Sequence, residues 1–287
     1  MKQLNLFIDL VRLKKPIGFM LLFWPCIWGL TVAYDLNQDL NDYFFYLTLF
    51  FLGSVFMRSA GCIVNDILDK DFDRNVLRTK HRPIASKKIS VKLGLFYTTI
   101  LCLLALSVLI NFNILTIILA IGSMPLAFSY PLMKRYTYWP QLFLGITFNY
   151  GLILGWTCVK NEIDIVPLIF YFGAIFWTLG YDTIYGFQDI KDDEIIGIKS
   201  TSIKFKKNPF IFLKTCYLIF AISLLFVGNM MELNKLYFIF LILVFFHIFY
   251  LQLNKLEIKR PKSCLLIFKS NNFLGLLVFV SILIGKV

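Results

Sequence analysis

The stretch LYFIFLILVFFHIFY, residues 236–250, decides the fold class of this chain. It is almost continuously apolar, and residues 114–120, ILTIILA, have the same character. A membrane-spanning β-strand would instead alternate polar and apolar side chains over segments of about ten residues. A continuous apolar run satisfies its own backbone groups in lipid only as a helix. The sequence therefore predicts an all-α integral membrane protein.

Apolar blocks of this kind recur along the whole sequence. Of its 287 residues, 59% are hydrophobic, 17% aromatic and only 16% charged, and the mean hydropathy is +0.74. Such a composition cannot supply an ordinary water-facing surface. A helix needs about 20 apolar residues to cross a bilayer, and we expect one transmembrane domain over residues 1–287. About nine spans are predicted, near residues 16–35, 43–64, 91–110, 112–132, 140–159, 164–186, 209–228, 235–252 and 265–285.

The net charge of +12 is unevenly distributed among the predicted loops. Most of the 29 Lys and Arg residues fall on one side of the membrane if alternate loops are assigned to alternate sides. Cytoplasmic loops carry this excess in membrane proteins, so the N-terminus is predicted to be cytoplasmic and the C-terminus external. The basic excess then reflects topology, and no nucleic-acid partner is expected. The six cysteines include no Cys-x-x-Cys pair, which favours neither a disulfide framework nor a zinc site.

Acidic and amide side chains gather at the end of the second predicted span. The cluster contains Asn65, Asp66, Asp69 and Asp73, and Arg58 precedes it by seven residues. Carboxylates are costly near hydrocarbon, so a membrane protein that gathers them is expected to use them on ions or substrate. At about 100° per residue, Asn65, Asp69 and Asp73 are predicted to form one helical stripe, with Arg58 about 10 Å deeper.

A second acidic cluster follows the sixth predicted span. Asp182, Asp189 and Asp193 are predicted to lie within about 40° of arc on one helix, flanked by Tyr185. Two rows of oxygen ligands on one side of the membrane suit a hard cation such as Mg²⁺, which shares its coordination with substrate phosphates. Mg²⁺ is therefore the expected cofactor. Its predicted ligands are Asn65, Asp69, Asp73, Asp182, Asp189 and Asp193.

Basic side chains follow each acidic cluster. Arg78 and Arg82 lie in RTKHRP, residues 78–83, and Lys199 lies in IGIKST, residues 196–201. Guanidinium groups bind phosphate oxygens in a bidentate manner. We therefore expect the two arginines to clamp a diphosphate that a metal ion alone cannot neutralise, with Lys199 as a further phosphate contact.

These motifs carry a family resemblance. The first cluster with R-T-x-x-R-P, and Y-D-T-x-Y followed by Q-D-x-x-x-D and G-x-K-S-T, resemble the two signatures of the UbiA superfamily of intramembrane aromatic prenyltransferases. Residues 12–18, 58–62 and 130–141 add RLKKPIG, RSAGC and YPLMKRYTYWPQ, which resemble the branch that acts on 4-hydroxybenzoate. The resemblance covers essentially the whole chain. Lys14 departs from the pattern, because relatives often have Asp or Asn there.

The resemblance implies nine helices around a central cavity in which a polyprenyl diphosphate is bound through Mg²⁺, its tail running toward lipid. The ring of 4-hydroxybenzoate would take the prenyl group ortho to its hydroxyl, releasing diphosphate, in ubiquinone biosynthesis. Arg135, with Lys134 beside it, would hold the acceptor carboxylate, Tyr130 would orient the tail or stabilise the allylic cation, and Asp182 or Asp189 would assist phenol deprotonation. The implied catalytic residues are Asp69, Asp73, Asp182, Asp189 and Asp193, and the implied substrate contacts are Asn65, Asp66, Arg58, Arg78, Arg82, Tyr130, Lys134, Arg135, Tyr185 and Lys199.

Other functions stay open at this point. A secondary transporter also places acidic groups inside helices, but it has no need for R-T-x-x-R-P behind them. A membrane alcohol phosphotransferase would concentrate its aspartates in one D-G-x-x-A-R cluster, which the chain lacks. Within the superfamily, haem and naphthoquinone-precursor acceptors are the alternatives. The first fifteen residues resemble neither a cleaved signal nor a transit peptide, which favours a bacterial cytoplasmic membrane. The sequence predicts no oligomeric state.

Overall fold

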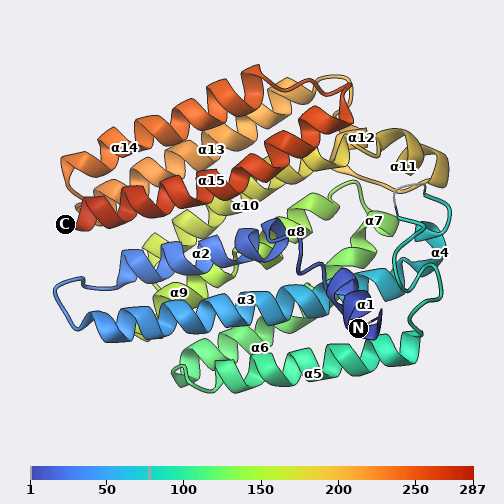
Figure 1. Ribbon diagram of the computed structural model, residues 1–287. Coiled ribbons are helices and arrows are strands. Elements are labelled where there is room, and N and C mark those ends of the chain that lie inside the picture. The colour runs from blue at the N-terminus through green and yellow to red at the C-terminus, as the bar shows by residue number, and fades with distance from the viewer. Residues whose placement is uncertain (1, 77–78) are drawn as a thin grey trace.

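The regular elements of the protein are helices throughout the described part of the chain. The structure is a computed structural model that describes residues 2–76 and 79–287. In chain order (Figure 1) the helices are α1 (Lys2–Leu10), α2 (Ile17–Ala33), α3 (Leu40–Leu68), α4 (Lys70–Asp73), α5 (Val91–Leu109), α6 (Ile114–Ser129), η1 (Tyr130–Leu132), α7 (Met133–Tyr136), α8 (Pro140–Asn149), α9 (Gly151–Lys160), α10 (Ile165–Gly186), α11 (Ile190–Ile196), α12 (Thr201–Lys204), α13 (Pro209–Met230), α14 (Lys235–Phe245), η2 (Phe246–Asn254) and α15 (Pro261–Lys286).

The predicted transmembrane character is confirmed. Within the described residues, eight helical segments are long and apolar enough to cross a membrane, and α2 adds a shorter apolar helix of 17 residues. They coincide with the predicted spans, although three are not regular α-helices throughout. The span that begins with α6 ends in the 3-10 turn η1, α8 and α9 meet at Tyr150, and α14 continues into the π-helical η2.

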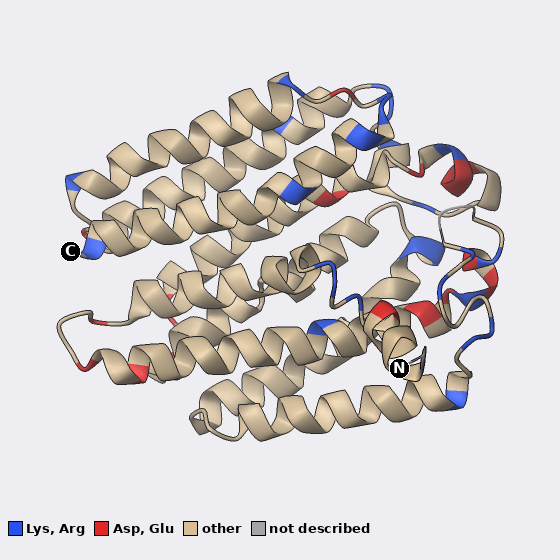
Figure 2. Ribbon diagram, in the orientation of Figure 1, with Lys and Arg blue, Asp and Glu red and all other residues tan. Residues whose placement is uncertain are grey.

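The short helices gather at one end of the bundle. Figure 1 shows α4, α7, α11 and α12 together at this end, near the N-terminus, while the C-terminus lies at the opposite end. Lys, Arg, Asp and Glu also concentrate there (Figure 2). Both acidic clusters therefore open at the same end, as predicted. That this end faces the cytoplasm stays a prediction from the charge distribution.

Aromatic packing joins α2, α10 and α13 at the centre of the bundle. Trp28 and Trp177 are fully buried with ring centroids 4.9 Å apart, and Phe220 stacks against both. On the other side of α2, a Cβ on Gly155 would lie 2.1 Å from the carbonyl oxygen of Cys26. Only glycine permits this contact between α2 and α9, which is a common way for membrane helices to approach closely.

The two predicted acidic stripes are each broken by a helix end. At Asp69, φ of −97° and ψ of 4° end α3, so Asp73 lies on the separate helix α4. In the second cluster α10 ends at Gly186, and Asp193 lies on α11. The prediction that each cluster occupies one face of a single helix is therefore wrong. The backbone turns at Asp69 and after Gly186 instead, and these turns fold the carboxylates over the end of the bundle.

Candidate active site

A cavity of about 360 Å³ lies where the ends of α3 and α10 meet the α6–η1–α7 segment. Both acidic clusters contribute to its wall, through Asn65, Asp69, Asp73, Asp182, Tyr185, Asp189 and Asp193. The structure thus brings together residues that are more than a hundred positions apart in the chain, which is the spatial relationship that the sequence predicts.

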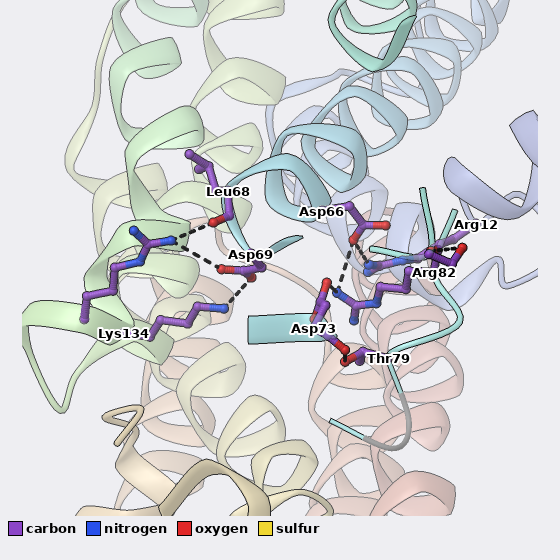
Figure 3. Close-up of polar contacts among 10 residues, drawn as sticks. Arg12, Asp66, Leu68, Asp69, Asp73, Thr79, Arg82 and Lys134 are labelled. Atoms are coloured by element: carbon purple, nitrogen blue, oxygen red, sulfur yellow. Dashed lines mark hydrogen bonds and ion pairs between the residues drawn. The ribbon is translucent and has the colours of Figure 1, made fainter. Parts of the chain in front are cut away.

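Two arginines hold the first cluster in place (Figure 3). Arg12 Nη2 donates to Asp66 Oδ1 at 2.6 Å, and Arg82 Nη1 donates to the same oxygen at 3.1 Å. Arg82 Nη1 also donates to Asp73 Oδ2 at 2.8 Å, and the Thr79 hydroxyl donates to the carbonyl oxygen of Asp73 at 3.2 Å. Both carboxylates are buried, and such groups are tolerated only when they are paired.

Asp69 has a different environment from its neighbours. Lys134 Nζ donates to its Oδ2, whereas Oδ1 is buried and has no hydrogen-bond partner among the described residues. Arg135 Nη2 lies 3.9 Å from Oδ1 and donates instead to the carbonyl oxygen of Leu68 at 2.7 Å. An unsatisfied buried carboxylate oxygen is costly, so Asp69 is prepared for a further positively charged or donor ligand.

Arg12 reaches the cavity through an unusual backbone turn. Its φ of 57° lies in the left-handed region, which few non-glycine residues occupy. The turn joins α1 to α2 and places the guanidinium beside Asp66 in the cavity wall. Burial lowers the pKa of Arg12 and the anionic Asp66 raises it; the net change is a rise, so the side chain stays charged.

Arg58 lies at the deep end of the cavity. It precedes the end of α3 by ten residues, or about 15 Å at the helical rise. Its guanidinium is 5.3 Å from the centroid of the Phe148 ring, and its Nε is buried without a hydrogen-bond partner in the described structure. A Cβ on Gly18 would come within 2.7 Å of this Nε, so the glycine makes room for the arginine. Tyr130 and Asp182 line the same region.

A second, apolar cavity of about 420 Å³ adjoins this deep end. Arg58, Tyr130 and Phe148 line both cavities, so the two lie side by side. The apolar cavity runs toward the opposite end of the bundle, where Phe50 and Phe112 pack with ring centroids 4.9 Å apart. An elongated hydrocarbon attached to a charged head group fits this succession of environments.

The oxygen donors around the polar cavity fit a hard cation such as Mg²⁺. Across residues 2–76 and 79–287, no three His, Cys, Asp or Glu side chains converge closely enough to hold a metal ion by themselves. Mg²⁺ usually keeps waters and shares its coordination with substrate phosphates, so it needs only one or two protein carboxylates. The unsatisfied Oδ1 of Asp69 is suited to this role, and Asp189 and Asp193 line the same cavity.

The remaining predicted residues differ in their relation to the cavity. Lys199 lines it, with its backbone N–H donating to Lys134 O at 2.9 Å and its Nζ donating to Tyr136 O at 3.2 Å. The Tyr185 ring packs 4.4 Å from Phe268. Arg135 is exposed and outside the cavity wall, where its guanidinium lies over the Phe72 ring. Arg78 lies outside the described residues.

Several residues of the cavity wall were not among the predicted site residues. Arg12 and Tyr181 both line it, and each belongs to a motif quoted above, RLKKPIG and Y-D-T-x-Y respectively. The available signal for Arg12 was a basic residue in a motif that leads into the first predicted span. For Tyr181 the signal was its position directly before Asp182 on an otherwise apolar helix.

The fold and the cavities define a polytopic membrane protein with a charged internal site beside an apolar chamber. The chain belongs to the UbiA prenyltransferase family, whose model matches residues 22–280. It is 42% identical over 286 residues to a mitochondrial 4-hydroxybenzoate polyprenyltransferase of Bos taurus, covering 99% of this chain and 76% of the relative. It is 39% identical over 289 residues to 4-hydroxybenzoate geranyltransferase 2 of Lithospermum erythrorhizon, covering 99% and 92%.

The architecture is also similar to that of a solved structure. A UbiA homologue from Archaeoglobus fulgidus, bound to GPP and Mg²⁺, superposes with a TM-score of 0.68 at 18% sequence identity. The similarity covers 97% of this chain and 99% of that protein. At this level of identity the match supports the fold, and it agrees with the helical membrane architecture described above.

Proposed function

We propose that the protein transfers a polyprenyl group from polyprenyl diphosphate to 4-hydroxybenzoate, ortho to the hydroxyl, with release of diphosphate. The observation that carries this proposal is the junction of a cavity lined by carboxylates and cations with an apolar cavity of about 420 Å³. The acceptor is inferred from relatives about 40% identical over nearly the full chain that are named for 4-hydroxybenzoate. We further propose that the reaction belongs to ubiquinone biosynthesis and that the protein resides in a bacterial cytoplasmic membrane.

The diphosphate is proposed to bind at the polar end. Asp69, Asp73, Asp189 and Asp193, with Asn65, would hold Mg²⁺, which neutralises phosphate charge and assists departure of the leaving group. Arg82, Lys134 and Lys199 line the same cavity, as does Arg12, which is paired with Asp66. These cations supply positive charge where negative charge develops as the allylic carbon–oxygen bond breaks. Arg78, which lies five residues after Asp73 in the sequence, is proposed to join these cations.

The acceptor is proposed to bind deeper, with its carboxylate on Arg58. Arg58 lines the cavity with an unsatisfied buried Nε, whereas Arg135 lies outside the cavity wall and donates to Leu68 O. We therefore assign the carboxylate to Arg58 in place of Arg135. A carboxylate is the acceptor that best matches a guanidinium in a low-dielectric site.

Proton removal is assigned to Asp182. This residue lies four positions before the end of α10, about 6 Å deep at the helical rise, and therefore between Arg58 and the carboxylates at the mouth. Its carboxylate would take the phenol proton as the ring carbon attacks the allylic cation. The proton on that carbon would then pass to the released diphosphate, and Asp182 would return its proton to the phenol oxygen. The Tyr130 and Phe148 rings line this region and would stabilise the cation through their faces.

A direct assay tests the function. Purified protein is supplied with Mg²⁺, a prenyl diphosphate and one acceptor at a time, and the product is identified by mass spectrometry and ring-proton NMR. We expect a 3-prenyl-4-hydroxybenzoate and stoichiometric diphosphate. If product forms only with a haem or naphthoquinone precursor, that precursor replaces 4-hydroxybenzoate as the assigned acceptor. If the protein transfers phosphate to or from a prenyl alcohol and prenylates no ring, the proposed reaction class is overturned.

A further inference from the structure

The hydroxyl of Tyr181 is a buried donor without a partner inside the active-site cavity. Tyr181 is only 1% exposed, and it lines the polar cavity beside Asp182. Its Oη has no hydrogen-bond partner in the described part of the protein. Thr178 lies one turn earlier on α10, and its hydroxyl accepts a hydrogen bond from Asn149 Nδ2 at 2.7 Å. Buried tyrosine hydroxyls usually find a partner.

The surrounding packing fixes the position of this ring. Trp177 meets Tyr181 edge to face with centroids 5.0 Å apart, and Phe268 lies 5.8 Å away on another side. Trp177 is itself anchored, because its Nε1 donates to Asn271 Oδ1 at 2.8 Å. A Cβ on Gly180 would lie 2.6 Å from the Tyr217 ring, so the backbone is packed closely here as well. The hydroxyl therefore cannot turn away to find a partner elsewhere.

Arg58 Nε is the second unsatisfied buried donor in this cavity. Both residues line the polar cavity, and a carboxylate offers about four acceptor sites on two oxygens, so one carboxylate can accept from both donors. A phenol hydroxyl offers fewer acceptor sites than a carboxylate. In the proposed reaction the phenol hydroxyl is instead a donor to Asp182. The chemistry of the cavity wall therefore favours a carboxylate shared between Arg58 and Tyr181.

We propose that Tyr181 is a specificity residue that donates a hydrogen bond from its hydroxyl to the carboxylate of the aromatic acceptor, beside Arg58. The proposal rests on the proposed function and adds a contact to it. A neutral donor fixes the direction of the carboxylate, which the charge of Arg58 alone does not. The ring then presents its ortho carbon to the allylic cation in one orientation.

Two simple competitors separate the possibilities. Benzoate carries the carboxylate without the hydroxyl, and phenol carries the hydroxyl without the carboxylate. Inhibition constants of both are measured against 4-hydroxybenzoate in the wild type and in Tyr181→Phe, together with the KM of the prenyl diphosphate. We expect Tyr181→Phe to weaken benzoate about 10- to 100-fold, the range for one hydrogen bond to a charged group. Inhibition by phenol and the donor KM should change less than about twofold.

Tyr171→Phe is the matched control. It removes a hydroxyl from the same helix, where Tyr171 Oη donates to Ile146 O at 2.8 Å outside the cavity wall. Any loss from general loosening of α10 should appear in both variants. Unchanged benzoate inhibition in Tyr181→Phe, or a change confined to phenol, would overturn the proposal. A wild type that never prenylates 4-hydroxybenzoate would overturn the proposed function instead, which distinguishes the two failures.

Discussion

Arg82 and Asp73 form an ion pair of 2.8 Å at the mouth of the cavity. In the proposed reaction the first is a ligand of diphosphate and the second a ligand of the metal. In the structure the guanidinium and the carboxylate therefore bind each other, through the same groups that would bind the diphosphate and the metal. On binding of a metal diphosphate, Asp73 would hold the metal and Arg82 the phosphate, so neither buried charge would be left unpaired.

Arg82→Ala should damage both stability and turnover. It leaves Asp73 without its ion pair and Asp66 with Arg12 alone, which should lower the free energy of unfolding by about 1–3 kcal/mol. It should also lower kcat/KM at least about 100-fold, because positive charge is lost near the leaving group. Thermal unfolding in detergent and initial rates measure the two effects. Arg74→Ala removes an exposed pair with Asp71 and a hydrogen bond from Arg74 Nε to Ala85 O at 3.1 Å, and it should leave kcat/KM unchanged and lower stability less than Arg82→Ala does.

Asp69→Ala and Asp189→Ala should each abolish turnover, since both carboxylates line the cavity and are assigned to the metal. Chelation with EDTA should have the same effect on the wild type, and added Mg²⁺ should restore its activity but not that of the variants. Product formation by mass spectrometry measures all three. Asp71→Ala, an exposed carboxylate outside the cavity wall, serves as the control. Full activity in both variants would remove the metal assignment.

Arg58→Ala should raise the KM for 4-hydroxybenzoate more than Arg135→Ala does. The physical reason is position, because Arg58 lines the cavity and Arg135 is exposed outside it. Loss of a charged hydrogen bond predicts an increase of about 10- to 100-fold for Arg58→Ala. Steady-state kinetics with the acceptor varied provide the measurement. A larger effect in Arg135→Ala would return the carboxylate to the residue that the sequence motif first indicated.

Gly53→Leu should restrict the tail rather than the chemistry. A Cβ on Gly53 meets only Val108 Cγ1, at 3.9 Å, so a side chain there enters the apolar cavity without a backbone clash. We expect a lower kcat/KM for long prenyl diphosphates relative to geranyl diphosphate, measured in competition. Gly122→Leu is the control, because Gly122 has open space around its Cβ position and lies outside the cavity wall. Equal losses for short and long donors in Gly53→Leu would contradict the placement of the tail.

Lys286→Ala should destabilise the end of the bundle far from the active site. Lys286 Nζ donates to the carbonyl oxygens of Thr31 at 3.0 Å, Val32 at 2.8 Å and Tyr34, which belong to the last turn of α2. Removing it leaves these acceptors unsatisfied and should lower the free energy of unfolding by about 1–3 kcal/mol. The melting temperature in detergent is the measurement, and Lys235→Ala at an exposed position is the control. KM values should stay unchanged in both.

Hydrophobic run length predicted the helical membrane fold well, because spanning helices are a direct response to bilayer thickness. It did not predict where helices end inside a polar cluster. The break at Asp69 and the end of α10 at Gly186 depend on local backbone turns that periodicity does not encode. The helical stripes were therefore wrong in detail, although the two clusters do meet at one cavity.

The sequence predicted which residues belong to the site better than it predicted the role of each residue. The motif that contains Lys134 and Arg135 gave two adjacent cations, and helical geometry directs adjacent side chains about 100° apart. Only Lys134 reaches the cavity wall, while Arg135 turns to Leu68 O. Arg12 was overlooked because its contact with Asp66 spans 54 residues and requires a left-handed turn in the chain.

The apolar cavity borders the bilayer between α5 and α6. Helix α5 packs on α3, whereas α6 packs on α9 and α8, and the cavity wall between them includes Leu106 and Ile121, which are 46% and 53% exposed. A hydrocarbon longer than the chamber can thus pass sideways between these two helices. Under the proposed function, the size of the chamber would then set no upper limit on the length of the transferred chain. The prenylated product can diffuse away in the plane of the bilayer without ever meeting water.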